Sequence, residues 1–239
     1  MGDGRVLAAL IGIVGILIKQ FWDGYYNNKK NKKLLKEQKV QFDRTQNNLL
    51  SKLMYEEIKD KKLVVEKKLS EFYYPMKNYL RRSKSAYTIF TSNKPEEYRT
   101  LEHLLDKEKL FNNEKIELSD NDKVLLKRIF FIGEEIENLI SEKCHLIFDD
   151  SEFMGTYIPS EGYEDYNYPN DESLISMTQN HLSFIRDAFY GELSEDLERF
   201  KLYVYPRELN SRITAKIDEL ENKVKSFELQ MEQFKDSIK

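Results

Sequence analysis

The chain has 239 residues, of which 33% are charged, yet its formal net charge at pH 7 is only −4. This balance excludes the strongly basic surface on which nucleic-acid binding depends, so we do not expect a nucleic-acid partner. The single cysteine, Cys144, excludes an internal disulfide and a zinc site with paired thiolates. Glycine and proline are scarce beside lysine, glutamate and leucine, so the composition predicts an all-α fold.

The most apolar stretch of the chain is Val6–Ile18, which contains no charged or strongly polar residue. As a helix this run would be about 20 Å long, and the longer stretch from Arg5 to Trp22 would be about 27 Å long. The longer stretch approaches the thickness of a bilayer core if Arg5 and Lys19 extend toward the headgroups. We therefore predict a transmembrane anchor over residues 1–24. A cleavable signal peptide is the alternative, but a lysine-rich block follows instead of a small-residue cleavage site.

The charges on either side of this stretch predict its orientation. Arg5 is the basic residue that precedes it, whereas a block of lysines follows it. The positive-inside rule then predicts a single-pass protein of the bacterial inner membrane, with its N-terminus outside and its C-terminal domain in the cytoplasm. Membrane lipid is accordingly an expected partner. Gly4, Ala8 and Gly12 recur at every fourth position, which favours close packing of two such helices and hence a homo-oligomer.

A long juxtamembrane helix is predicted over residues 25–74, either continuous or as two helices with a small break near Gln46-Asn47-Asn48. Between Gly24 and Pro75 the chain has neither glycine nor proline, and its first part carries few apolar residues whereas its second part is amphipathic. Pro75 lacks an amide donor and disfavours helical geometry at Tyr74. We therefore predict a helix boundary or a kink at Pro75.

A cytoplasmic helical bundle is predicted over residues 75–205. Its centre is Val124–Phe148, where apolar residues cover too wide an arc for a helix with one wet face. Neighbouring helices must therefore surround this helix. Ser119, with Asp122 three residues later, predicts the start of the helix because these side chains suit an N-terminal cap.

The segment 149–171 interrupts the helical pattern and interleaves acidic residues with tyrosines. It is too long for an ordinary connection, and loops of this length are either functional or mobile. One interpretation is a contact surface, and the other is a mobile insertion. After it, Glu172–Tyr190 predicts an amphipathic helix with Gly191 as its C-terminal cap. The tyrosines of the predicted contact loop are Tyr157, Tyr163, Tyr166 and Tyr168.

The C-terminal segment 206–239 has the clearest periodicity in the chain. Its apolar residues alternate steps of four and three, which predicts a coiled-coil helix. This narrow seam can pack against the same helix of another subunit, or antiparallel against the long helix of its own chain. We favour packing between subunits. The seam consists of Ile213, Ile217, Leu220, Val224, Phe227, Met231, Phe234 and Ile238.

No motif in the sequence predicts catalysis, a cofactor or a metal site. There is no glycine-rich phosphate loop, two-histidine metal motif or nucleophile elbow. Cys144 and His145 would point about 100° apart on a helix, so we expect packing residues that face the core rather than metal ligands. His181 is expected to be a buried histidine with a hydrogen-bond partner. Arg99 and His103 approach the arginine–histidine motif of HEPN ribonucleases, but they lie closer together in sequence than that motif requires.

A basic cluster precedes the bundle's central helix. Such a cluster can neutralise phosphates, but four charges on one helix are more simply a solvated face. The cluster consists of Lys77, Arg81, Arg82 and Lys84.

A phenylalanine-tyrosine-x-proline turn follows the lysine-rich helix, within Leu69–Met76, and His181-Leu182 lies on a later helix. With the N-terminal apolar stretch, these features resemble a diffuse bacterial group of single-span proteins with helical cytoplasmic domains. Within it the chain is similar to the membrane accessory proteins of type VI-B CRISPR loci and to other membrane effectors of phage defence. The resemblance implies a HEPN-like bundle, a ring or pore of several copies, and loss of membrane integrity during infection.

Three functional hypotheses follow from this reading. The first is a membrane-anchored oligomeric effector of bacterial antiviral defence that permeabilises the inner membrane, without catalytic residues or cofactors, and with a partner protein of the same defence system. The second is a membrane-tethered scaffold or sensor that recruits a partner through its coiled coil. The third is a HEPN-like ribonuclease.

Overall fold

The structure is a computed structural model that describes residues 3–159, 171–193, 197–200 and 203–238. Within these ranges, the side chains of residues 3–14, 16–18, 197–198 and 236–238 lie outside the description. The chain divides into two units. The first consists of Met1–Lys59 with Leu229–Lys239, and the second consists of Asp60–Glu228.

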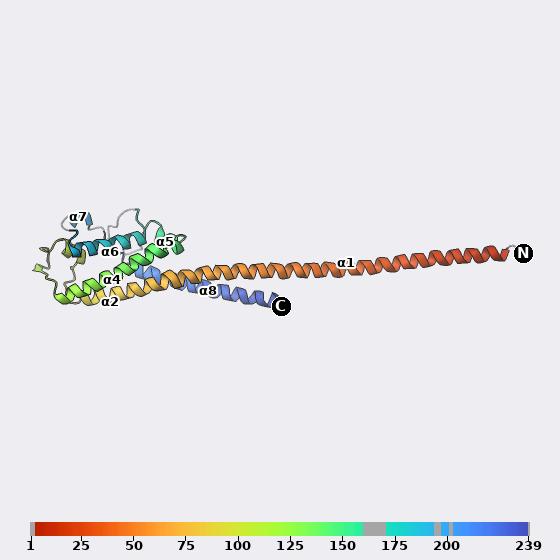
Figure 1. Ribbon diagram of the computed structural model, residues 1–239, viewed down its shortest axis with the longest axis horizontal. Coiled ribbons are helices and arrows are strands. Elements are labelled where there is room, and N and C mark those ends of the chain that lie inside the picture. Colours follow the sequence, from red (N-terminus) through yellow and green to blue (C-terminus); the bar gives the residue numbers. More distant parts are fainter. Residues whose placement is uncertain (1–2, 160–170, 194–196, 201–202, 239) are drawn as a thin grey trace. The chain divides into compact units, whose positions relative to one another are not determined.

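Helix α1, Asp3–Lys68, begins in the first unit and ends in the second (Figure 1). Every side chain from residue 19 to residue 50 is exposed. The sequence explains this continuous helix, because the chain has no glycine or proline between Gly24 and Pro75. Lysine, glutamate, glutamine and leucine, which are common in this stretch, have high helix propensity. The predicted long helix over residues 25–74 is therefore part of a longer helix that ends a few residues earlier than predicted.

The predicted transmembrane anchor over residues 1–24 is overturned. No helix in the part of the chain whose side chains are described is both long enough and apolar enough to cross a membrane. The physical reason lies in the length of the apolar run. Val6–Ile18 makes about 20 Å of helix against a hydrocarbon layer of about 30 Å, and Lys19 and Gln20 follow it directly. The same finding removes the basis for a single-pass inner-membrane protein with an outer N-terminus and a cytoplasmic C-terminal domain.

Pro75 is accommodated by a change of helix type rather than by a break. A π-helical turn, η1 (Leu69–Tyr73), follows α1 and leads into α2, Tyr74–Thr91. The Tyr74 amide donates to the carbonyl of Leu69, five residues earlier. Pro75 then stands in the first turn of α2, where a missing amide donor costs least.

Helix α4, Asp120–Lys143, is the central helix of the second unit and packs along α2 (Figure 1). Its first turn is closed by a capping box, in which the Ser119 hydroxyl accepts from the Asp122 amide and the Asp122 carboxylate accepts from the Ser119 amide. The predicted helix start at Ser119 is confirmed. A single 3₁₀ turn, η2 (Cys144–Ile147), continues the chain after α4.

Helix α6, Leu174–Tyr190, also begins and ends where the sequence indicates. The Ser173 hydroxyl accepts from the Ser176 amide, and Gly191 follows with a φ of +80°, which glycine adopts without strain. The shorter helices of the second unit are α3 (Thr100–Leu105), α5 (Ser151–Met154) and α7 (Leu197–Phe200).

A small antiparallel hairpin, which the sequence analysis did not predict, follows α3. Its strands are β1, Leu110–Phe111, and β2, Glu114–Lys115, with Leu110 opposite Lys115. Asn112 and Asn113 form the turn with φ values of 52° and 63°. Asparagine tolerates this left-handed conformation, which a type I′ turn requires at both central positions of a two-residue hairpin loop.

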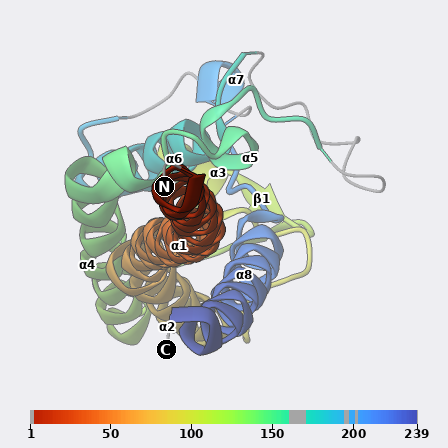
Figure 2. The ribbon, with the colours of Figure 1, turned by 90° about the vertical axis from the view of Figure 1, so that its right-hand side faces the viewer.

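Two apolar clusters form the core of the second unit. The first joins the end of α1, η1, the start of α2, the end of α4, the start of α6 and helix α8, Leu209–Ile238. The second joins the end of α2, α3, β1, the start of α4, the end of α6 and α7. Because α2, α4 and α6 contribute to both clusters, these three helices connect them. Figure 2 shows α2, α4 and α8 in end-on view.

The predicted seam on α8 packs within its own chain over much of its length. Ile213, Ile217 and Leu220 are buried in the first cluster, and Val224 and Phe227 are half-buried against it. The favoured packing between subunits therefore does not describe these five residues. Of the remaining seam residues, Met231 and Phe234 belong to the first unit and are half-buried, and the side chain of Ile238 lies outside the described residues.

Polar contacts beside this seam give its direction. Lys62 pairs with Glu228 at 2.8 Å, and the Tyr74 hydroxyl donates to Glu221 at 2.9 Å. From the first of these contacts to the second, the residue number rises from 62 to 74 on the α1–α2 side and falls from 228 to 221 on α8. The helices are therefore antiparallel, which is the second of the two arrangements that the periodicity allows.

Candidate functional site

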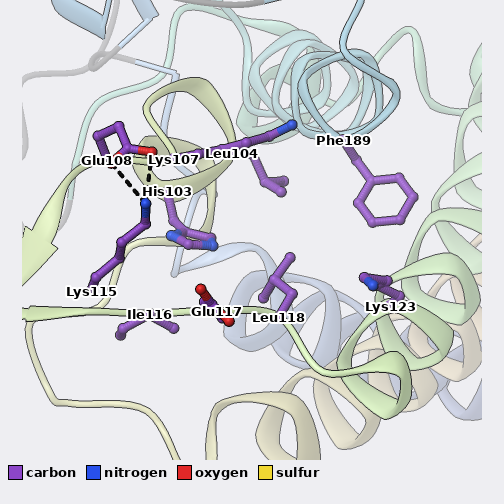
Figure 3. A pocket seen from close by; sticks show the side chains of 10 residues that line it. All are labelled: His103, Leu104, Lys107, Glu108, Lys115, Ile116, Glu117, Leu118, Lys123 and Phe189. Carbon is purple, nitrogen blue, oxygen red and sulfur yellow. Dashed lines mark hydrogen bonds and ion pairs between the residues drawn. The ribbon is translucent and has the colours of Figure 1, made fainter.

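A cavity of about 540 Å³ lies in the second unit beside α3 (Figure 3). Its wall comes from α3, the turn after it, strand β2 with the extended segment that leads to α4, the first turn of α4 and the end of α6. We call it the His103 cavity. It is lined by His103, Leu104, Lys107, Glu108, Lys115, Ile116, Glu117, Leu118, Lys123 and Phe189.

Local contacts hold the polar side of this cavity in place. The Asp106 carboxylate accepts from the Glu108 amide at 3.0 Å, which orders the turn after α3. The hairpin then brings Lys115 back to Glu108, whose two carboxylate oxygens both lie 2.7 Å from the ammonium nitrogen. The following segment leads directly to the Ser119 capping box. Neighbouring elements of the sequence thus build one wall, and Phe189 of α6 forms part of another.

His103 is the chemically most unusual residue of the cavity. Its side chain is only 4% exposed, and its ring packs against the rings of Tyr98 and Phe111 at centroid distances of 5.4 and 6.1 Å. Its Nδ1 atom is buried and has no hydrogen-bond partner in the described part of the chain. A buried polar atom without a partner costs roughly 1–3 kcal/mol. Figure 3 shows this ring among the side chains that line the cavity.

Burial lowers the pKa of His103, and the nearby ammonium groups of Lys94 and Lys107 lower it further. A pKa below the ordinary value of about 6.5 leaves the imidazole neutral at pH 7. The ring can then donate one hydrogen bond and accept another. It is suited to orient a polar group rather than to supply a positive charge.

The lysines at this cavity differ in whether an ion pair already engages their ammonium groups. Lys115 is held by Glu108, whereas Lys107 has no ion-pair partner among the residues described. Lys123 pairs with Asp120 at 3.0 Å, but both side chains are largely exposed, and such pairs contribute little. Figure 3 shows the ammonium groups of Lys107 and Lys123 toward Phe189.

Arg99 and His103 have different surroundings in the structure. The Arg99 guanidinium donates to the carbonyls of Glu96 and Tyr98, at 3.0 and 3.1 Å, and its side chain is exposed. These bonds stabilise the turn before α3. The Arg99 side chain thus bonds to backbone carbonyls, whereas His103 lines the cavity.

His181 has the hydrogen-bond partner that was expected. Its Nδ1 lies 2.8 Å from the carbonyl oxygen of Tyr203, and burial lowers its pKa, while this bond partly opposes the shift. Cys144 packs half-buried against the first cluster, as predicted. His145 is exposed, however, so its prediction as a core residue was wrong. No group of three or more histidine, cysteine, aspartate or glutamate residues in the described ranges could hold a metal ion.

Of the four tyrosines of the predicted contact loop, the structure describes Tyr157, which is buried. Its hydroxyl donates to Glu208 at 2.6 Å, and the Arg212 guanidinium lies 5.1 Å from its ring centroid. Tyr157 therefore belongs to the fold rather than to an open contact surface. Tyr163, Tyr166 and Tyr168 lie outside the described residues.

Two further groups from the sequence analysis lie on helices. Gly4, Ala8 and Gly12 belong to α1, but their surroundings lie outside the description. The basic cluster of α2 is exposed, in agreement with a solvated face. Its members are Lys77, Arg81, Arg82 and Lys84.

A second candidate surface lies on α1 in the first unit. Leu35, Phe42, Leu49 and Leu53 are 59–63% exposed and follow one another at steps of seven, seven and four. This spacing places them on one side of the helix, and we call them the arm stripe. Helical periodicity places the half-buried Tyr55 on nearly the opposite side. The arm stripe is therefore separate from the shielded side of the helix.

Comparisons with known proteins supply no relative from which a site could be assigned. No known protein family, no curated protein and no solved structure matches the chain. The resemblance to accessory proteins of type VI-B CRISPR loci stays a prediction.

The sequence analysis missed most of the His103 cavity. Lys107, Lys123 and Phe189 carry no motif, and they come together only because α3 and α6 pack against each other. The one local signal was the pair of asparagines that turns the hairpin and brings Lys115 back to Glu108.

The two histidines with lowered pKa values predict a pH-dependent stability. The pKa values of His103 and His181 are lowered in the folded chain. At a pH between these lowered values and the ordinary value of about 6.5, the unfolded chain therefore binds more protons than the folded chain. The stabilisation is therefore complete above pH 6.5 and is lost as the pH falls from there toward the folded-state pKa values. We expect the free energy of unfolding, measured by urea denaturation, to fall between pH 7.5 and about pH 5.5. A variant of the exposed histidine, His145→Gln, should retain this fall, and a flat profile in the wild type would contradict the assignment.

Proposed function

We propose that the chain is a helical scaffold that assembles with further copies of itself through the arm stripe on α1. The observation that carries this proposal is the run of exposed side chains from residue 19 to residue 50, which includes large apolar residues. A helix that exposes such residues to water gains free energy when another helix covers them. This proposal retains the scaffold function and the homo-oligomer expected from the sequence, without the membrane tether.

The arm stripe is large enough to support association. Fully burying one leucine or phenylalanine side chain contributes roughly 1.5–3 kcal/mol. Because only about 60% of each side chain is still exposed, the four residues of each copy supply about 7–14 kcal/mol in a dimer, against an estimated 4–15 kcal/mol for the lost freedom of two molecules. A second copy is the partner to which we commit, because every copy carries the same stripe and can form a self-complementary interface.

Charge favours an antiparallel arrangement of the two arms. The segment 29–39 carries six lysines and a single glutamate, Glu37. In a parallel pair these lysine blocks would lie side by side and repel each other, whereas in an antiparallel pair they lie apart. Leu35, Phe42 and Leu49 repeat every seven residues, as one of the two apolar positions of a heptad does. The other apolar position, four residues later, holds Lys39 and Gln46 in the first two heptads. The pairing is therefore expected to be weaker than that of a continuous coiled coil.

The substitution Phe42→Asp tests this assembly. Phe42 is 62% exposed, so the change should leave the fold of a single chain intact. A charge in the middle of the paired stripe should reduce the mass measured by light scattering to that of one chain, 28.6 kDa.

Val40→Asp is the matched control, because Val40 is also exposed but lies on nearly the opposite side of the helix. It should leave the oligomer unchanged. A wild-type protein that is monomeric at about 100 μM, or an equal loss of mass in both variants, would overturn assembly through the arm stripe.

Phage defence is the biological setting that we propose for this scaffold, with a partner protein from the same defence system. Its support is the resemblance carried by Leu69–Met76 and by His181-Leu182. Bacteria that express the chain with its neighbouring genes can be challenged with phage, and protection should depend on Phe42 but not on Val40. Membrane permeabilisation is not part of the proposal, because its predicted anchor is overturned.

A further inference from the structure

We propose that the His103 cavity is a binding site for a small molecule that joins an aromatic ring to a phosphate group, as a nucleoside monophosphate does. The site is independent of the arm stripe and lies wholly within the second unit. Four features carry the proposal: the volume of the cavity, its buried histidine, its available ammonium groups and its apolar wall.

The volume suits a ligand of this size. Small-molecule sites occupy about 300–1,000 Å³ and combine an apolar lining with a few convergent polar groups. The His103 cavity measures about 540 Å³ and has both kinds of lining residue.

The buried imidazole indicates that a polar ligand completes the site. The His103 side chain is only 4% exposed, and its buried Nδ1 has no hydrogen-bond partner among the residues described. Buried polar groups in folded proteins nearly always have a partner. The neutral ring can donate to an acceptor atom, or accept from a donor atom, on the edge of a heterocyclic base.

The available ammonium groups indicate an anionic group on the ligand. Lys107 has no ion-pair partner in the described ranges, and Lys123 has only an exposed one. In Figure 3 the Lys107 ammonium lies at the upper edge of the cavity and the Lys123 ammonium at its lower right edge, with Phe189 between them. Two lysines can neutralise a phosphate, and charge-assisted hydrogen bonds of this kind are stronger than neutral ones.

The remaining wall suits an aromatic ring and a sugar. Leu104, Leu118 and Phe189 provide an apolar surface, and an aromatic ring stacks favourably on a phenylalanine. The Glu117 carboxylate lies in the same wall and is exposed. It would repel a second anion but can accept hydrogen bonds from ribose hydroxyls, so it favours a ligand with one phosphate over one with several.

Calorimetric titration of the full chain with adenosine monophosphate tests the proposal, with adenosine and inorganic phosphate as separate arms. The intact nucleotide should bind at least tenfold more tightly than either part. The double variant Lys107→Ala, Lys123→Ala should weaken this binding at least tenfold. Lys127→Ala, an exposed lysine one turn further along α4, is the matched control and should leave the affinity within about twofold of the wild type.

A measurement on the wild type tests the role of His103, because a variant of this buried residue could fail to fold. The imidazole signals of the three histidines can be followed by NMR during the same titration. Only the signal of the buried His103 should shift, while those of His145 and His181 stay in place. Absence of heat and of a shift at 10 mM nucleotide would overturn the site, as would binding that survives loss of both lysines. Phosphate alone binding as tightly as the nucleotide would refute an aromatic ligand.

Discussion

Replacement of Asp150 by alanine is expected to lower the free energy of unfolding by about 1–3 kcal/mol, the cost of leaving a buried polar group without its partner. The Asp150 carboxylate is 8% exposed, accepts a 2.7 Å hydrogen bond from the Tyr73 hydroxyl, and pairs with Lys216 at 3.2 Å. Removal of the carboxylate leaves the fully buried Tyr73 hydroxyl without this acceptor. It also removes one of the two counter-ions of Lys216, whose ammonium keeps its 2.9 Å pair with Glu219. Urea denaturation followed by circular dichroism measures the loss.

The neighbouring residue provides the control for this prediction. Asp149 also pairs with a lysine, Lys68, at 2.6 Å, but its side chain is 76% exposed. Exposed ion pairs contribute about 0–1 kcal/mol, so Asp149→Ala should cost far less than Asp150→Ala. Equal losses in the two variants would show that burial of the Asp150 cluster does not matter for stability.

Replacement of Leu220 by aspartate is expected to prevent cooperative folding of the second unit. Leu220 is 4% exposed within the first cluster, and an isolated buried carboxylate costs several kcal/mol, which is comparable with the total stability of a domain. If the seam instead packed only between subunits, the same change would separate folded subunits. Circular dichroism and thermal melting distinguish the two results.

Leu229→Asp is the control on the same helix, because Leu229 is 63% exposed. This variant should keep the helical signal and the melting transition of the wild type. A folded but smaller Leu220→Asp protein would contradict the packing of this seam within its own chain.

The parts of the fold that could be predicted from the sequence are those determined by local chemistry. The capping box at Ser119 and the left-handed glycine at position 191 each involve only nearby residues. The periodicity of α8 also predicts its apolar face, since the spacing of apolar side chains determines which side of a helix is buried. Its partner could not be predicted, because the same seam suits a neighbouring subunit or another helix of the same chain.

The errors and omissions have physical causes as well. The anchor prediction required charged residues at both ends of a short apolar run to reach the headgroups. No helix among the residues whose side chains are described is long and apolar enough to cross a membrane. The His103 cavity was missed because its residues are ordinary by type. They become a candidate site only where packing of α3 against α6 leaves an imidazole without a partner.

The antiparallel position of α8 has a consequence for synthesis of the chain. Phe72 and Met76 are fully buried in the first cluster, yet this cluster also needs Ile213, Ile217 and Leu220 from near the C-terminus. During translation the early apolar residues leave the ribosome long before the last helix exists. The nascent chain therefore exposes an aggregation-prone apolar surface until the segment that forms α8 emerges. A chaperone that covers Phe72 and Met76 during that interval would prevent aggregation.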